Sequence, residues 1–209
     1  MSSTPAKIDL KKELKRYFSA PAKDFELVEL GPVAYLMIDG EGNPNTAPAY
    51  ISAVEALYAA SFTIKFASKK LLGRDYVVAP LEGLWTADDP ASFTKGAKDD
   101  WRWTMMIMQP DWITADLAAE GIAAAKAKKK LDALDQLRFE TLTEGLCAQI
   151  LHTGSYDDEA PTLDRLHNEF MPANGLTFNG LHHEVYLGDP RKVAPEKLKT
   201  VLRQPVRPS

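Results

Sequence analysis

The chain has 209 residues, of which 45% are hydrophobic and 26% charged, with a formal net charge of −4. This size and composition are typical of a globular protein that buries a core as one large domain or two small ones. The acidic balance argues against nucleic acid as the main partner, and no apolar run approaches the roughly 20 residues of a membrane span. A single cysteine, Cys147, and a charged N-terminal stretch predict a cytoplasmic protein without a signal peptide.

The first half of the chain predicts a short helix, a hairpin, a long helix and several strands. The charged segment 8–18 has helical spacing and ends before Pro21. Strand-like runs on either side of Gly31-Pro32 predict a hairpin, and the glycine-rich stretch that follows lacks the lysine of a phosphate-binding loop, so we interpret it as a turn. The expected elements are strands 25–30 and 33–38, helix 48–66, strands 76–79 and 84–86, a polar loop at 88–100, and strand 101–108.

The second half repeats the pattern of the first. After a helix at 113–130, the expected elements are strands 137–143 and 146–152, helix 157–170, strand 181–187 and a final edge strand 198–204. Gly145 and Gly154 stand at the same offset from Gly31 and Gly40, so both hairpins share one register. We therefore predict an α+β fold of duplicated strand-helix-strand-strand units with antiparallel sheets, pseudo-twofold symmetry and a ligand pocket between the halves.

The strand at 181–187 carries the most informative polar residues. Because side chains alternate along a strand, His182, Glu184 and Tyr186 share one face, whereas the opposite face is mostly apolar. A carboxylate in such a segment is bonded by neighbours, exposed at an edge, or available to a ligand. The pattern alone leaves these three alternatives open.

A second aromatic feature is the run Trp-Arg-Trp-Thr-Met-Met-Ile-Met at 101–108. Alternation places Trp101, Trp103 and Met105 on one face of this strand. Large aromatic side chains most often pack in cores, which is the interpretation favoured for Trp101 and Trp112. Tryptophan followed by methionines also suits an adaptable ligand wall, which is the hypothesis for Trp103.

Five segments taken together resemble the GyrI-like small-molecule-binding proteins. They are Tyr35-Leu-Met-Ile-Asp-Gly-Glu-Gly-Asn-Pro44, Pro80-Leu-Glu-Gly-Leu-Trp85, Trp103-Thr-Met-Met-Ile-Met-Gln-Pro-Asp111, His152-Thr-Gly-Ser-Tyr-Asp-Asp-Glu159 and the stretch from His182 to Lys199. The resemblance covers about residues 8–206. It implies an N-terminal helical extension at 1–24 and one domain at 25–206, made of repeats at about 25–112 and 137–206 joined by helix 113–130.

The resemblance also implies an aromatic pocket with a glutamate near its floor. Carried over position by position, the glutamate falls on Glu184, the aromatic residue after the long loop on Trp103, and two further pocket aromatics on Tyr156 and Trp85. Ser155 replaces the proline that usually precedes the tyrosine, which is expected to loosen that loop. We predict Glu184 and Trp103 as catalytic residues, and as ligand-binding residues Trp85, Met105, Tyr156, His182 and Tyr186.

Two functions follow from the resemblance and remain open. Stand-alone relatives hydrolyse cyclopropane-bearing DNA-alkylating natural products, which predicts binding of flat aromatic or cationic xenobiotics with Glu184 as a base on water. Other relatives sense ligands, so the alternative is a non-catalytic sensor or sequestering protein, which could inhibit a partner protein that the sequence does not identify. No helix-turn-helix segment precedes the domain, which argues against a DNA-binding regulator.

Metal and thiol chemistry are weaker alternatives. His182, Glu184 and His152 could form a metal site, but no recognised ligand spacing such as HExxH is present. Cys147 lies in an apolar strand, where an inert thiol is usual. The sequence therefore predicts a small-molecule ligand and neither a cofactor nor a metal.

Overall fold

A computed structural model describes residues 7–87 and 98–209, so most of the predicted polar loop at 88–100 lies outside the described residues. The strands are β1 (Ile8–Asp9), β2 (Glu26–Leu30), β3 (Val33–Glu41), β4 (Tyr76–Val77), β5 (Leu81–Ala87), β6 (Trp101–Gln109), β7 (Arg138–Leu142), β8 (Gly145–Thr153), β9 (Leu176–Phe178), β10 (His182–Tyr186) and β11 (Lys199–Pro208). The main helices are α1 (Leu10–Glu13), α2 (Lys15–Phe18), α3 (Pro48–Leu72), α5 (Ala115–Lys128), α6 (Ala160–Arg165) and α7 (Met171–Ala173). Short helical turns are η1 (Lys98–Asp100), η2 (Asp132–Gln136), η3 (Tyr156–Asp158), η4 (Leu166–Phe170) and η5 (Pro195–Lys197).

One large antiparallel sheet organises the chain, which confirms the predicted α+β class. Its strands follow the order β2-β8-β11-β10-β5-β6-β3-β7, with β9 added alongside β11, while β1 and β4 form a separate parallel pair. When the strands are matched by repeat, this order reads the same from both ends. The two halves therefore meet at the central pair β5–β10. The pseudo-twofold symmetry itself stays a prediction, which this order supports.

Neither of the two predicted hairpins forms, across Gly31-Pro32 or at Gly145. Strand β2 pairs with β8, and β3 pairs with β6 and β7, so each half lends its first strand to the other half. Adjacency in sequence favours hairpins, but this exchange closes both halves into one sheet. The last strand is also not an edge strand, because β11 lies between β8 and β10 and most of its residues are buried.

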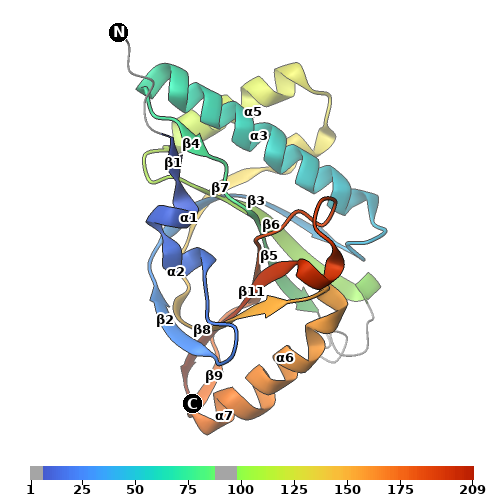
Figure 1. The fold of residues 1–209 in the computed structure, drawn as a ribbon. Helices are drawn as coiled ribbons and strands as arrows, with labels where there is room; N and C mark the ends of the chain where they lie inside the picture. Colours follow the sequence, from blue (N-terminus) through green and yellow to red (C-terminus); the bar gives the residue numbers. More distant parts are fainter. Residues whose placement is uncertain (1–6, 88–97) are drawn as a thin grey trace.

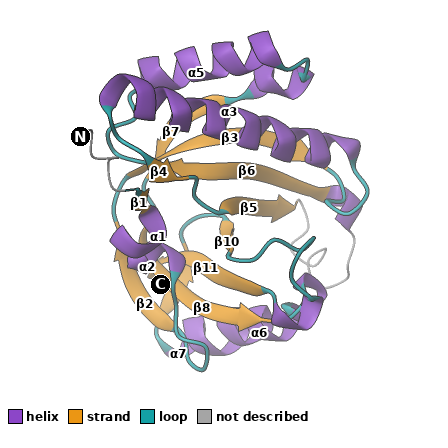
Figure 2. Cartoon of the chain, turned by 45° about the horizontal axis from the view of Figure 1, so that its top comes forward, coloured by secondary structure: helices purple, strands orange, loops and turns teal. Residues whose placement is uncertain are grey.

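Helices α3 and α5 pack together over β3 and β6, whereas α6 and α7 lie at the β8–β9 end of the sheet (Figures 1 and 2). Helix α3 begins at Pro48, which is tolerated in a first turn, and ends before Gly73, whose φ of 66° forms a left-handed C-cap. In residues 7–87 and 98–209, no helix has the length and apolar character needed to cross a membrane.

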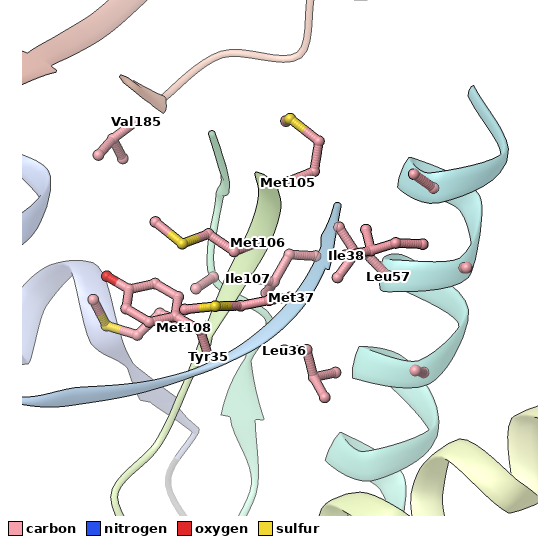
Figure 3. Packing of buried hydrophobic residues seen from close by; sticks show 14 of the residues in the cluster. Tyr35, Leu36, Met37, Ile38, Leu57, Met105, Met106, Ile107, Met108 and Val185 are labelled. Atoms are coloured by element: carbon pink, nitrogen blue, oxygen red, sulfur yellow. The ribbon is translucent and has the colours of Figure 1, made fainter. Parts of the chain in front are cut away.

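The two faces of the sheet carry different cores. Leu36 and Ile38 of β3 point toward Leu57 of α3, whereas Tyr35 and Met106 lie on the opposite face (Figure 3). All five are at most 1% exposed, so the sheet is buried on both sides here. This double burial explains why 101–108 is an almost continuous apolar run rather than a polar-apolar alternation.

Candidate functional site

A cavity of about 790 Å³ opens over the β5–β10 seam. Its lining comes from α3, from β5 and β10 on the floor, and from η1, η3 and the start of α6 at the side. Of the predicted site residues, five line it together: Trp85, Tyr156, His182, Glu184 and Tyr186. They come from both halves of the chain, as the resemblance implies.

Glu184 lies on the cavity floor, opposite Gly83 of β5 and Leu202 of β11. Its side chain is 13% exposed. A Cβ atom on Gly83 would lie 2.9 Å from Trp85 Nε1 and 3.2 Å from Tyr186 Oη. The absence of a side chain at Gly83 therefore creates the space in which the polar groups around Glu184 meet.

A short chain of hydrogen bonds orients the Glu184 carboxylate. Trp85 Nε1 donates to Tyr186 Oη at 2.9 Å, and Tyr186 Oη donates to Glu184 Oε2 at 2.7 Å. Because indole only donates, the tyrosine hydroxyl must direct its own proton to the carboxylate. Burial, followed by the charge of Glu184, raises the pKa of Tyr186 well above its usual value, so it remains a neutral donor.

The second oxygen of Glu184 is less constrained. Its Oε1 lies 3.3 Å from His182 Nε2, but both ring nitrogens of His182 are buried without a well-formed hydrogen bond. No arginine or lysine in the described part of the chain pairs with Glu184. One oxygen is thus held by a neutral donor, and the other faces the cavity beside an imidazole.

Aromatic rings form the walls around this carboxylate. Tyr156 meets Tyr186 edge-on at 5.5 Å between centroids, and Trp85 lies 6.4 Å from Tyr50 and 5.5 Å from Trp101. Burial, then Glu159 and Glu184, raises the pKa of Tyr156 to about 12. The walls therefore present neutral rings whose faces favour flat apolar groups and positive charge.

Trp103 and Met105, predicted as site residues, pair with Trp85 and Gly83 and so share the face of the sheet that carries Glu184, but they are not among the lining residues of the cavity. Trp103 is 2% exposed; its ring covers Gly40, where a Cβ would approach within 2.1 Å, and its Nε1 donates to the Gly42 carbonyl at 3.3 Å. It also contacts Tyr50 edge-on, with centroids 5.3 Å apart. Trp103 therefore packs between the sheet and α3 beside the cavity, and the glycine-rich stretch makes room for its indole.

Among the lining residues that the sequence interpretation missed are three aromatic residues and one carboxylate: Tyr50, Tyr58, Trp101 and Glu159. Tyr50 and Tyr58 lie in the predicted helix 48–66, to which the sequence analysis assigned no site residue, and Trp101 was assigned to core packing. Glu159 stands immediately before α6 and is 4% exposed. The signal for Glu159 was its place at the end of the His152–Glu159 segment.

The opposite face of β10 carries a buried charged cluster, formed by Glu82, Glu144, His183 and Arg203. His183 lies 3.0 Å from Glu82 Oε2 and 2.9 Å from Glu144 Oε1, and Arg203 Nη1 donates to Glu144 Oε2 at 3.0 Å. Burial alone would raise the pKa of Glu144, but His183 and Arg203 lower this pKa to about 2. His183, expected among apolar core residues, is thus buried as an ion-pair partner.

The residues that the sequence analysis weighed for metal or thiol chemistry, His152 and Cys147, make contacts within the protein or are buried. His152 Nε2 lies 3.1 Å from the Ser155 carbonyl, and Ser155 Oγ donates to Asp158 at 2.7 Å, which gives the loop before Tyr156 its own hydrogen bonds. Cys147 is buried, which raises the pKa of its thiol to about 12. Within residues 7–87 and 98–209, no group of three or more metal-ligating side chains is placed to hold an ion.

Comparison with known proteins agrees with this architecture. The profile of the GyrI-like small molecule binding domain family matches residues 23–207. The chain belongs to this family. No curated protein matches the chain.

Solved GyrI-like structures include similar stand-alone proteins. An uncharacterized conserved protein from Listeria innocua is 37% identical, with a TM-score of 0.87 over 96% of this chain and all of the other. A protein described as a hydrolase from Listeria innocua is also 37% identical, with a TM-score of 0.83 over the same shares. The EcmrR C-terminal domain, at 10% identity and a TM-score of 0.54, shares the fold alone over 89% of this chain and 98% of its own.

Proposed function

We propose that this GyrI-like protein binds planar aromatic or cationic xenobiotics and hydrolyses an electrophilic member of that class, namely a cyclopropane-bearing alkylator. The observation that carries the proposal is Glu184: a carboxylate on a cavity floor, oriented by a neutral phenol and walled by aromatic rings. The 37% identity to a protein described as a hydrolase supports turnover in addition to binding.

The reaction would be addition of water to the strained ring. A ligand stacked between Tyr156 and Trp85 exposes its cyclopropane carbon to a water held by Glu184, which accepts the proton as general base. The new carbon–oxygen bond forms as a ring carbon–carbon bond breaks. The released electron pair moves into the conjugated carbonyl, and the resulting phenolate takes a proton from solvent.

Mass spectrometry of the products tests this reaction. We expect wild type to convert a spirocyclopropyl cyclohexadienone to its water adduct and to incorporate ¹⁸O from labelled water. Glu184→Gln should lose most of this activity, whereas Glu196→Gln, an exposed glutamate in the following loop, should retain it. Unchanged alkylator with wild type, despite binding measured by calorimetry, would exclude the hydrolase and support a sequestering or sensing protein.

A further inference from the structure

Glu159 is the most buried of the carboxyl groups that line the cavity, and neither the proposed reaction nor the aromatic walls give it a role. It is 4% exposed, lines the same cavity as Glu184, and its Oε1 is buried without a hydrogen-bond partner. A buried glutamate of this kind needs a partner for its charge or must hold a proton. Its surroundings decide between the two.

We propose that Glu159 and Glu184 form a carboxyl pair that holds one proton in the free protein, and that a cationic ligand expels this proton when it binds. This inference rests on the proposed function, because it specifies how the same cavity recognises positive charge. It goes further by making Glu159 a ligand-binding residue and by coupling affinity to pH.

Most of the groups that face the pair are neutral, which favours the retention of one proton by the two carboxyl groups. From β10 these are His182 and Tyr186; η3 contributes Tyr156, α3 contributes Tyr50, and η1 contributes Lys98. The three tyrosines are neutral and cannot balance a second negative charge. Burial, and then the charge of Glu184, raise the pKa of Glu159 well above its usual value, which outweighs the opposite effects of Thr200 and Lys98.

Lys98 is the cation that interacts with Glu159, but it is already engaged. Its Nζ lies 2.6 Å from Asp157 Oδ1 and 5.7 Å from the centre of the Trp101 ring. This ammonium group therefore sits at the cavity rim, neutralised by a carboxylate that is itself exposed. Two carboxyl groups with one proton then present a single negative charge to the cavity, and they can present two once a cation enters.

The consequence for binding is a linkage between ligand and proton. While Glu159 is protonated, a cation that prefers two carboxylates must release the proton, so its affinity rises with pH by up to about tenfold per unit. The rise stops once the pair is fully ionised. A neutral ligand of the same shape shows no such dependence, because it gains nothing from a second carboxylate.

Calorimetry with a matched pair of probes tests the coupling. N-methylacridinium is a permanent planar cation, and acridine at mildly alkaline pH is its neutral counterpart. Titrating N-methylacridinium into wild type in phosphate and in Tris, whose ionisation heats differ, should show release of close to one proton. Glu159→Gln, which keeps the neutral shape, should bind the same cation with almost no release and a flat pH profile. Acridine should release none from either protein.

The free protein provides a second readout that does not depend on any ligand. With ¹³C-labelled glutamate carboxyls, the Glu159 resonance should titrate well above the ordinary glutamates and move toward them in Glu184→Gln. Glu159 titrating with the surface glutamates, or equal proton release by wild type and Glu159→Gln, would overturn the pair. Failure of N-methylacridinium to bind, together with a high-titrating Glu159, would refute the proposed ligand class but leave the pair intact.

Discussion

Glu144→Gln tests whether the buried cluster behind the site holds the seam strand in place. The substitution keeps the side chain's size but removes the negative charge between His183 and Arg203. The pKa of Glu144 falls from an ordinary 4.5 to about 2 on folding, which corresponds to about 3 kcal/mol of stability at neutral pH. This agrees with the roughly 3–5 kcal/mol lost when one partner of a buried ion pair is removed.

The loss should depend on pH in a defined direction. Because folding lowers the pKa of Glu144, its contribution is complete above the unfolded-state pKa and disappears as the pH falls toward about 2. Urea unfolding followed by circular dichroism should therefore show wild type and Glu144→Gln differing by about 3 kcal/mol at neutral pH and by about 2 kcal/mol near pH 3.5.

Glu140→Gln is the matched control, because Glu140 lies on β7, four residues before Glu144, with a side chain that is 54% exposed and paired with Arg138. It should change stability by less than about 1 kcal/mol. If Glu144→Gln costs no more than this control, the cluster does not stabilise the fold. If its cost is large but independent of pH, the loss comes from packing and the electrostatic reasoning is wrong.

Three further predictions concern close packing and burial. Gly83→Ala should weaken N-methylacridinium binding about tenfold, measured by calorimetry, because the added methyl displaces Trp85 and Tyr186 from Glu184; unchanged affinity would contradict this. Gly40→Ala should cost about 1–3 kcal/mol in urea unfolding, with altered tryptophan fluorescence, because the methyl overlaps the Trp103 ring; wild-type stability and fluorescence would show that the ring is not fixed there. Cys147 should react with an aromatic disulfide reagent only in denaturant, because burial raises its pKa to about 12; rapid reaction of the native protein would contradict this.

The face assignment of the seam strand was predictable because it needs only the two-residue period of a strand. Alternation placed His182, Glu184 and Tyr186 together, and the structure brings all three to the cavity. The same argument placed His183 on the buried face, where it is fully buried. It could not show that His183 pairs with charged groups, because Glu144 approaches from the β7–β8 turn and Arg203 from β11.

The sequence could not predict the exchange of first strands between the halves, because this too depends on contacts between distant segments. A hairpin and a crossover between repeats use the same apolar alternation and the same Gly31-Pro32 connection, so the local pattern does not choose the pairing partner. Glu159 was missed similarly. Its burial depends on the approach of the chain before α6 to Glu184 of β10 and Thr200 of β11, which no local spacing encodes.

Strand β10 has buried acidic groups near both of its faces, and the two faces differ in whether these groups are paired with cations. On the core face, Glu82 and Glu144 are matched by His183 and Arg203, so that charge is balanced inside the protein. On the cavity face, Glu184 lies beside a neutral tyrosine, an imidazole and the carboxyl group of Glu159, and no lysine or arginine of the described residues pairs with it. The negative charge on the cavity face therefore lacks the cationic partner that the core-face cluster has. This arrangement is suited to pairing with a positively charged ligand. The balanced cluster fixes β10 between β5 and β11, and this fixed strand is what allows the unmatched carboxylate to stay directed at the cavity.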